Sequence, residues 1–250
     1  MKYNIPNNST KKCRDASEVI RSGSYCETEF SIEDAESFIE ELGKANNEGD
    51  KERALEWGTQ EHTNFYFEMV PLLKIAKNKS DTNKDIKILF SGPKQNLYDG
   101  IIMINNTKNK VQCVSAVDGY QESLRREYLS QDDVRFVKGM GDVEYTGSKH
   151  NRRFKDNSAP TAVQIEGEDW NNDHKKIIST ALEKKLNEKY TGYWLSVAID
   201  DSHYFNLNEN TERLKRLIDD IIKEKKNNIF RIFPKIFFTG MRTELFLEYD

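Results

Sequence analysis

Two apolar, β-branched runs joined by a polar turn lie near the middle of the chain: Leu97-Tyr98-Asp99-Gly100-Ile101-Ile102-Met103-Ile104, then Asn105-Asn106-Thr107-Lys108-Asn109, then Lys110-Val111-Gln112-Cys113-Val114-Ser115-Ala116-Val117. This pattern is typical of a β-hairpin. After Asp118-Gly119 the sequence is rich in helix formers, with Leu124, Tyr128 and Leu129 on one side. The stretch therefore predicts strand, turn, strand and helix, with Asp99 opening the first strand.

Periodicity on either side of this hairpin predicts an alternation of helices and strands. Helical spacing indicates helices at 31–43, 59–77, 177–186 and 214–222, and short apolar runs indicate strands at 86–90, 134–137, 161–165, 193–199, 229–238 and 245–249. Ser31 fits a Ser-x-x-acid cap, Gly43 a helix end, Pro71 a kink, and Asn210 or Thr211 a further cap. The polar segment 147–160 has the composition of a loop.

Length and the absence of an internal repeat favour one domain. With 250 residues we expect a single α/β domain over 1–250, built on a mixed central sheet flanked by helices. The first 25 residues are polar at their start, and we expect them to form a loose N-terminal extension. The 13 Phe, 11 Tyr and 3 Trp argue against disorder, because disordered chains contain few aromatic residues.

Charge, cysteine usage and hydropathy limit the class of protein. The net charge of −4 gives no global basic field, so any contact with nucleic acid must use a local patch. The three cysteines are widely spaced and form no CxxC pair, which fits reduced thiols in a cytoplasmic protein and gives no zinc signature. The sequence contains neither an apolar leader region nor a run of ~18 apolar residues, so we expect no membrane span.

At the hairpin the chain resembles the PD-(D/E)XK nuclease superfamily. The resemblance is carried by the acidic helix, the strand opening on Tyr98-Asp99 and the second strand with its following helix. More closely, 111–119, Leu124-Arg125 and the run 193–201 are similar to bacterial members of that group, over about residues 55 to 200. The resemblance implies a restriction-endonuclease-like fold and metal-dependent cleavage of DNA or RNA phosphodiesters, with Mg²⁺ as the cofactor.

The resemblance also implies a set of site residues. Asp99 matches the first metal-binding acid, Gln112 the position of the second acid, and Val114 the position of the lysine. Gln112 and Val114 are departures, since glutamine offers a carbonyl oxygen without charge and valine neither charge nor proton. Glu61 or Glu68 of the preceding helix could supply a carboxylate. Lys110, which shares a strand face with Gln112, would stabilise charge in the transition state.

A basic cluster gives a candidate nucleic-acid contact. Lys149, His150, Arg152, Arg153 and Lys155 lie within seven positions and could hold backbone phosphates, and Arg125 on the following helix could do the same.

Each of these residues also has a structural interpretation. Asp99 precedes Gly100 and could shape a turn, Gln112 could be a hydrogen-bonded interior amide, and Lys110 could be simply exposed. Glu61 and Glu68 could be solvated helix residues. The basic segment could be a solvated loop, and Arg125 could pair with a neighbour on its helix.

Three functional hypotheses follow. The first is a divalent-cation-dependent nuclease. The second is a nuclease-fold protein without activity that binds a protein partner, such as a toxin-neutralising immunity protein or a defence-system component. The departures at Gln112 and Val114 and the acidic balance favour this second hypothesis. The third is an unrelated α/β enzyme.

Overall fold

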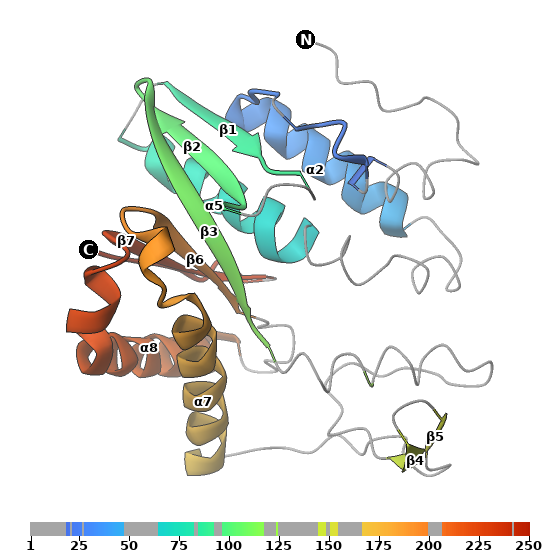
Figure 1. Ribbon diagram of the computed structural model, residues 1–250, viewed down its shortest axis with the longest axis vertical. Helices are drawn as coiled ribbons and strands as arrows, with labels where there is room; N and C mark the ends of the chain where they lie inside the picture. The colour runs from blue at the N-terminus through green and yellow to red at the C-terminus, as the bar shows by residue number, and fades with distance from the viewer. Residues whose placement is uncertain are drawn as a thin grey trace.

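The protein is an α/β structure with one mixed six-stranded sheet covered by helices on both faces (Figure 1). The computed structural model describes residues 19–20, 22–26, 28–47, 65–82, 85–92, 97–117, 124, 145–148, 151–154, 167–199, 207–241 and 243–250. In spatial order the strands are β1 (Ile86–Phe90), β2 (Gly100–Ile104), β3 (Thr107–Ala116), β6 (Trp194–Ile199), β7 (Lys235–Gly240) and β8 (Phe246–Tyr249). The helices are α2 (Ile32–Asn47), α5 (Val70–Ser80), α7 (Gly167–Lys185) and α8 (Leu207–Phe230).

The predicted hairpin is confirmed and forms the antiparallel half of the sheet. Strand β2 pairs with β1 on one side and β3 on the other, with Gly100 opposite Val111 and Ile104 opposite Thr107. Asn105 and Asn106 both have positive φ, 48° and 66°, as a two-residue hairpin turn with the right-handed twist of its strands requires. Pairing therefore resumes at Thr107, earlier than the polar composition of 105–109 indicates.

The other half of the sheet is mainly parallel. Strand β3 pairs with β6 and β6 with β7 in parallel, and β8 closes the edge antiparallel to β7. Helix α7 lies in the connection from β3 to β6, and α8 in the connection from β6 to β7. Because both faces of the sheet are covered here, β6 is buried at every position, which is why its sequence reads as a continuous apolar run.

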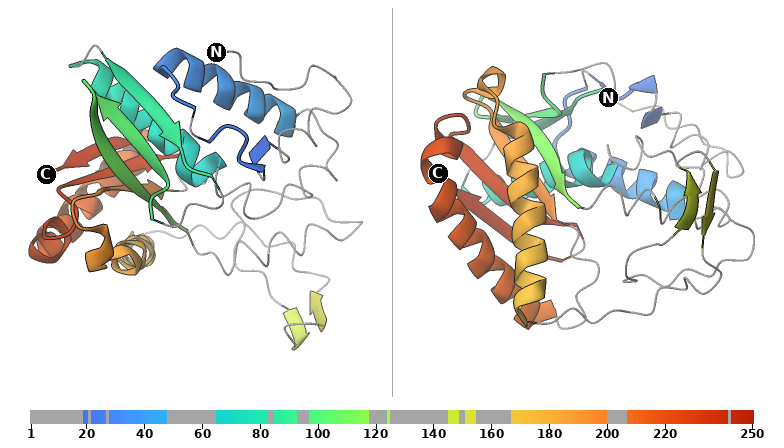
Figure 2. Two further views of the ribbon diagram at one scale, coloured as in Figure 1. Left: turned by 45° about the horizontal axis from the view of Figure 1, so that its top comes forward. Right: turned by 60° about the horizontal axis from the view of Figure 1, so that its bottom comes forward.

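Each face of the sheet carries its own apolar cluster (Figure 2). On one face α2 and α5 pack with the aromatic rings of Phe30, Phe38 and Phe90, and Ile20 and Tyr25 belong to the same cluster. The segment 1–25 therefore contributes core residues at its C-terminal end, and 1–18 lies outside the described residues. On the other face α7 and α8 bury their apolar stripes; the α8 stripe consists of Leu214, Ile218, Ile221, Ile222 and Ile229.

The predicted start of α2 is confirmed, whereas Pro71, predicted to kink a helix over 59–77, lies in the first turn of α5. The Ser31 hydroxyl accepts the Asp34 N–H at 3.1 Å and so caps α2. Before α5 the chain forms a π turn, η1 (Phe65–Met69), and the α-helix begins at Val70 with Pro71 in its first turn, where a missing N–H does no harm. Residues 59–64, where Glu61 lies, are outside the described part of the chain.

Several predicted boundaries are wrong, because tertiary packing overrides the local signal. Helix α2 continues past Gly43 to Asn47, and a Cβ added at Gly43 would lie 3.5 Å from the Phe65 ring. Helix α8 begins at Leu207, upstream of the predicted caps Asn210 and Thr211. It also includes Ile229 and Phe230, predicted as strand, because fully buried Ile229 continues the apolar stripe of the helix. Pro234 then separates the helix from β7.

The basic segment predicted as loop instead contains a short hairpin. Strand β4 (Tyr145–Ser148) pairs antiparallel with β5 (Asn151–Phe154), and this pair lies apart from the six-stranded sheet in every view (Figures 1 and 2). The expected strands at 134–137 and 161–165, and all of the helix expected after Gly119 except helical Leu124, fall outside the described residues. No helix in the described segments is long and apolar enough to cross a membrane.

Candidate functional site

Asp99 lies where the pairing between β2 and β3 ends. Its backbone is held on both sides: the Asp99 N–H donates to the Val111 carbonyl at 2.9 Å, and its own carbonyl accepts the Ser91 N–H at 3.2 Å. Its side chain then continues the hydrogen bonding to β3, because Oδ2 accepts the Cys113 backbone N–H at 2.6 Å. The carboxylate is therefore fixed in position, and its second oxygen is left for another partner.

Gln112 is the cross-strand neighbour of Asp99, as the resemblance implies. Its Nε2 donates to Asp99 Oδ2, and the residue is only 4% exposed. Its carbonyl oxygen Oε1 is buried and has no hydrogen-bond partner. The hydroxyls of Ser196 and Thr239 share that condition, but Gln112 differs because its amide nitrogen already binds the carboxylate of the site. An unpaired buried carbonyl costs about 1–3 kcal/mol unless something binds it.

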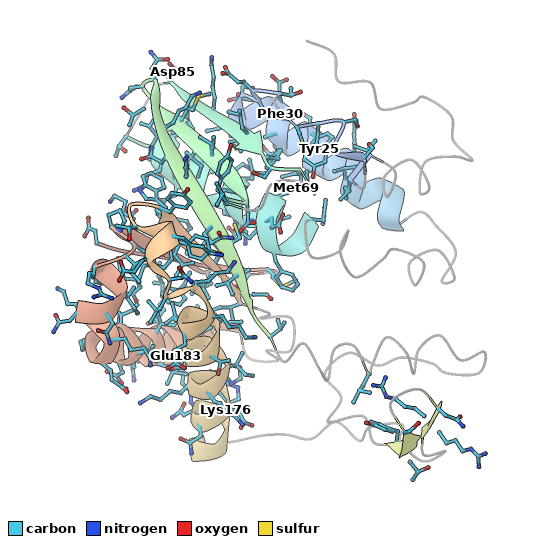
Figure 3. All side chains as sticks on the ribbon, viewed as in Figure 1. Tyr25, Phe30, Met69, Asp85, Lys176 and Glu183 are labelled. Atoms are coloured by element: carbon cyan, nitrogen blue, oxygen red, sulfur yellow. The ribbon has the colours of Figure 1, made fainter. Side chains whose placement is uncertain are left out.

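Glu68 brings a second carboxyl group to Asp99 from the η1 turn. This turn packs against both β3 and β6. Its neighbour Met69 is buried in the α2/α5 cluster where α5 meets the sheet (Figure 3). Burial, with the charge of Asp99 as the next cause, raises the pKa of Glu68 to about 8, against the opposing effect of Lys185. Burial also raises the pKa of Asp99, although the Cys113 N–H, Lys185 and Gln112 act the other way.

Lys185, the last residue of α7, supplies the positive charge that acts on both carboxyl groups. In Figure 3 α7 runs from Lys176 to Glu183 toward the hairpin, and Lys185 follows two residues later. No sequence signal selects this residue, because a lysine in the last turn of a helix is ordinary. Its place beside Asp99 arises only from the packing of α7 on β3.

Lys110 lies on the same face as Gln112 but has different neighbours. Its Nζ lies 5.5 Å from the centre of the Tyr98 ring and 5.3 Å from that of Tyr193. Val114, at the position where the family has lysine, packs partly buried against the α7/α8 cluster. The role in the transition state predicted for Lys110 stays a prediction.

The predicted phosphate-binding cluster is only partly described. Arg152 and Arg153 lie on β5, and the Arg152 guanidinium lies 5.0 Å from the Tyr145 ring centre. Lys149, Lys155 and Arg125 fall outside the described residues, as does Glu61. Within the described segments, none of the more extensive contacts between elements joins this hairpin to the six-stranded sheet.

Glu68, Asp99 and Gln112 carry oxygen atoms of the kind that a hard divalent cation such as Mg²⁺ prefers. The unpaired Gln112 Oε1 and the raised pKa of the two carboxyl groups both indicate that the site lacks positive charge. Among the described residues no group of three or more His, Cys, Asp or Glu side chains could hold a metal ion. A cation would therefore depend on the neutral amide oxygen. Burial raises the pKa of the Cys113 thiol well above its usual range, so this cysteine is a protonated core residue.

Comparison of the chain with protein-family models found no match, and comparisons with curated proteins and with solved structures found none either.

Proposed function

We propose that this protein is a restriction-endonuclease-like nuclease that cleaves DNA or RNA phosphodiesters with a divalent cation, in the manner of the PD-(D/E)XK superfamily. The order of elements supports the proposal: α5, then the antiparallel β1–β2–β3, then α7, then β6 parallel to β3. The observation that carries it is the meeting of Glu68, Asp99 and Gln112 at one point of the sheet.

Each residue has a defined part in the proposal. Asp99 would hold a cation through its carboxylate, with Gln112 offering Oε1 and Glu68 a second carboxylate. The bound cation stabilises negative charge on the phosphodiester and lowers the pKa of a water molecule. Lys185 supplies the positive charge that the lysine of the family pattern would provide and that Val114 cannot. It acts from α7 rather than from β3.

The test is a cleavage assay on labelled single- and double-stranded DNA and RNA, with Mg²⁺, Mn²⁺ or EDTA. We expect cleavage only with a divalent cation, and Asp99→Asn should lower it by at least ~100-fold. Exposed Glu244 offers a matched control, since Glu244→Gln removes a carboxylate remote in sequence from the site and should leave the rate unchanged. Cleavage in EDTA, or full activity of Asp99→Asn, would refute the proposal.

A specific observation favours the second function, a nuclease-fold protein that acts by binding a protein partner. Gln112 brings no charge to the site, and Val114 is committed to packing against the α7/α8 cluster. Calorimetry with Mn²⁺ separates the two functions. A nuclease site binds the cation, and Asp99→Asn abolishes the heat of binding, whereas wild-type protein that takes up no Mn²⁺ supports the binding protein.

A further inference from the structure

A group of lysines and tyrosines lies beside the Asp99 site and takes no part in holding a cation. It consists of Tyr98, Lys110, Lys185, Lys189, Tyr190 and Tyr193, here called the lysine–tyrosine patch. Lys110 and Lys189 are exposed, and Tyr98 and Tyr193 are half-buried. The patch draws on three parts of the fold: the approach to β2, the middle of β3, and the connection from α7 to β6.

The tyrosine rings fix the lysine side chains in place. Lys110 Nζ lies between the rings of Tyr98 and Tyr193, at 5.5 and 5.3 Å from their centres. Lys185 Nζ and Lys189 Nζ lie 5.7 and 4.7 Å from the centre of the Tyr190 ring. These distances are in the range of cation–π attraction, which holds a flexible ammonium group without neutralising its charge.

A turn holds two of the rings together. Residues 190–193 form a turn closed by the Tyr193 N–H on the Tyr190 carbonyl at 3.0 Å, and Gly192 supplies the required φ of +84°. The ring centres of Tyr190 and Tyr193 are 6.2 Å apart. The positions of the ammonium groups are therefore built into the connection between α7 and β6.

The charges of Lys110 and Lys189 are not cancelled by neighbouring carboxylates. Lysines elsewhere in the described part of the chain commonly form ion pairs, as in Lys175–Glu224 at 2.8 Å and Lys225–Glu183 at 2.7 Å. Lys110, Lys185 and Lys189 form no ion pair within that part. Glu188, the acidic residue next to Lys189, is instead paired with Arg231 at 2.8 Å. Lys110 and Lys189 thus present exposed ammonium groups on a protein whose net charge is −4, while half-buried Lys185 acts on the carboxyl groups of Asp99 and Glu68.

The patch is also close to the carboxylates. Lys110 and Gln112 share a face of β3 and lie two residues, or about 7 Å, apart along the strand. Gln112 in turn binds Asp99, and Lys185 acts on the carboxyl groups of Asp99 and Glu68. A polymer with a phosphate at Asp99 would bring its neighbouring phosphates to the patch.

We propose that the lysine–tyrosine patch binds the phosphate backbone of the nucleic-acid strand that enters the Asp99 site. This inference rests on the proposed function for its choice of ligand. Because the rings are engaged with the ammonium groups, recognition is through phosphates and is independent of base sequence. The contribution of three lysines to the dependence of log K on log[salt] is a slope of about −2 to −3.

The experiment is fluorescence anisotropy of a labelled DNA or RNA oligonucleotide in EDTA, titrated with full-length protein at several salt concentrations. Lys110→Gln and Lys189→Gln should each weaken binding several-fold, and each should reduce the slope by ~0.7–0.9. The matched control is Lys226→Gln, which removes an exposed lysine of α8 and should change neither quantity. Tyr193→Phe should keep the affinity, whereas Tyr193→Leu should lose part of it because the ring over Lys110 is gone.

Three results would overturn the inference: no binding by the wild-type protein, slopes unchanged in both lysine variants, or displacement of the oligonucleotide by poly-glutamate as readily as by unlabelled nucleic acid. The last result would identify an acidic protein as the ligand. Because binding is measured without a divalent cation, it is independent of cleavage. If the protein binds through the patch but does not cleave, only the proposed nuclease activity is refuted. If it cleaves and the Lys110→Gln and Lys189→Gln variants bind with unchanged affinity and salt slope, only the role of the patch is refuted.

Discussion

Replacing Glu68 with glutamine should make the cation-free protein more stable at pH 8 and change its stability much less at pH 5. An unfolded glutamate has a pKa of about 4.3, and burial beside Asp99 raises the pKa of folded Glu68 to about 8. Between these values the folded protein binds more protons than the unfolded chain, so its stability falls as the pH rises through this window. Glutamine has the same shape and no proton to lose, so the variant escapes this loss.

The magnitude follows from the difference between the two pKa values. At ~1.4 kcal/mol for each tenfold change in the ionisation equilibrium, a fully buried carboxyl would lose about 5 kcal/mol between pH 4.3 and pH 8. Glu68 is half-buried as a whole residue, so solvent screens part of its charge. We therefore expect Glu68→Gln to exceed the wild type by about 2 kcal/mol at pH 8.

The assay is urea unfolding in EDTA at pH 5 and pH 8, followed by circular dichroism. The measured quantity is the difference in the free energy of unfolding between Glu68→Gln and the wild type at each pH. This difference cancels the titrating groups that do not interact with Glu68, and it includes the response of Asp99, which does. The control is Glu244→Gln, since Glu244 is exposed, and its difference should be the same at both pH values. If the difference in the free energy of unfolding between Glu68→Gln and the wild type does not grow with pH, the pKa of Glu68 is not raised by burial beside Asp99. The carboxyl group that we assign to the site would then be missing.

Four further predictions concern the same site and two glycines. Mn²⁺ should raise the melting temperature of the wild type and leave that of Asp99→Asn unchanged in a thermal shift assay, because binding to the folded state alone is stabilising. Lys185 lowers the pKa of Glu68, so its loss should make ionised Glu68 more destabilising. In urea unfolding at pH 8, Glu68→Gln should therefore raise the free energy of unfolding by more in the Lys185→Gln background than in the wild type. Gly192→Ala should cost about 1 kcal/mol in the same assay, since its φ is +84° although a Cβ there meets nothing within 4 Å. Gly43→Ala, in the interior of α2, should instead stabilise by about 0.5–1 kcal/mol.

The elements that the sequence predicts best are those with strong local determinants. The hairpin carries two asparagines that tolerate positive φ, and β6 carries an apolar run that only a strand buried on both faces explains. The pairing of Asp99 with Gln112 then follows from the register of that hairpin. The ends of helices are harder to predict. Gly43 and Ile229 both lie within helices, although the local propensity of each favours a different structure.

The candidate site could be predicted for the residues on neighbouring strands, and for Glu68 only as one of two acids that the family resemblance offered. Lys185 comes from a helix separated from β3 by a long connection, and no spacing rule links it to Asp99. The contact of Lys110 with the Tyr193 ring could not be predicted either. It depends on the parallel pairing of β3 with β6, which brings the two residues together. Long-range packing of this kind leaves no periodic signal in the sequence.

The two interpretations of Gln112 make opposite demands on its carbonyl oxygen. A structural interior amide is expected to satisfy both ends, because each unsatisfied polar atom costs about 1–3 kcal/mol. Gln112 satisfies only its nitrogen, and it does so on Asp99, whose pKa burial raises and the Gln112 hydrogen bond lowers. The amide therefore helps to keep Asp99 ionised while leaving its own oxygen open, which is the arrangement that a cation would complete and that packing alone does not require.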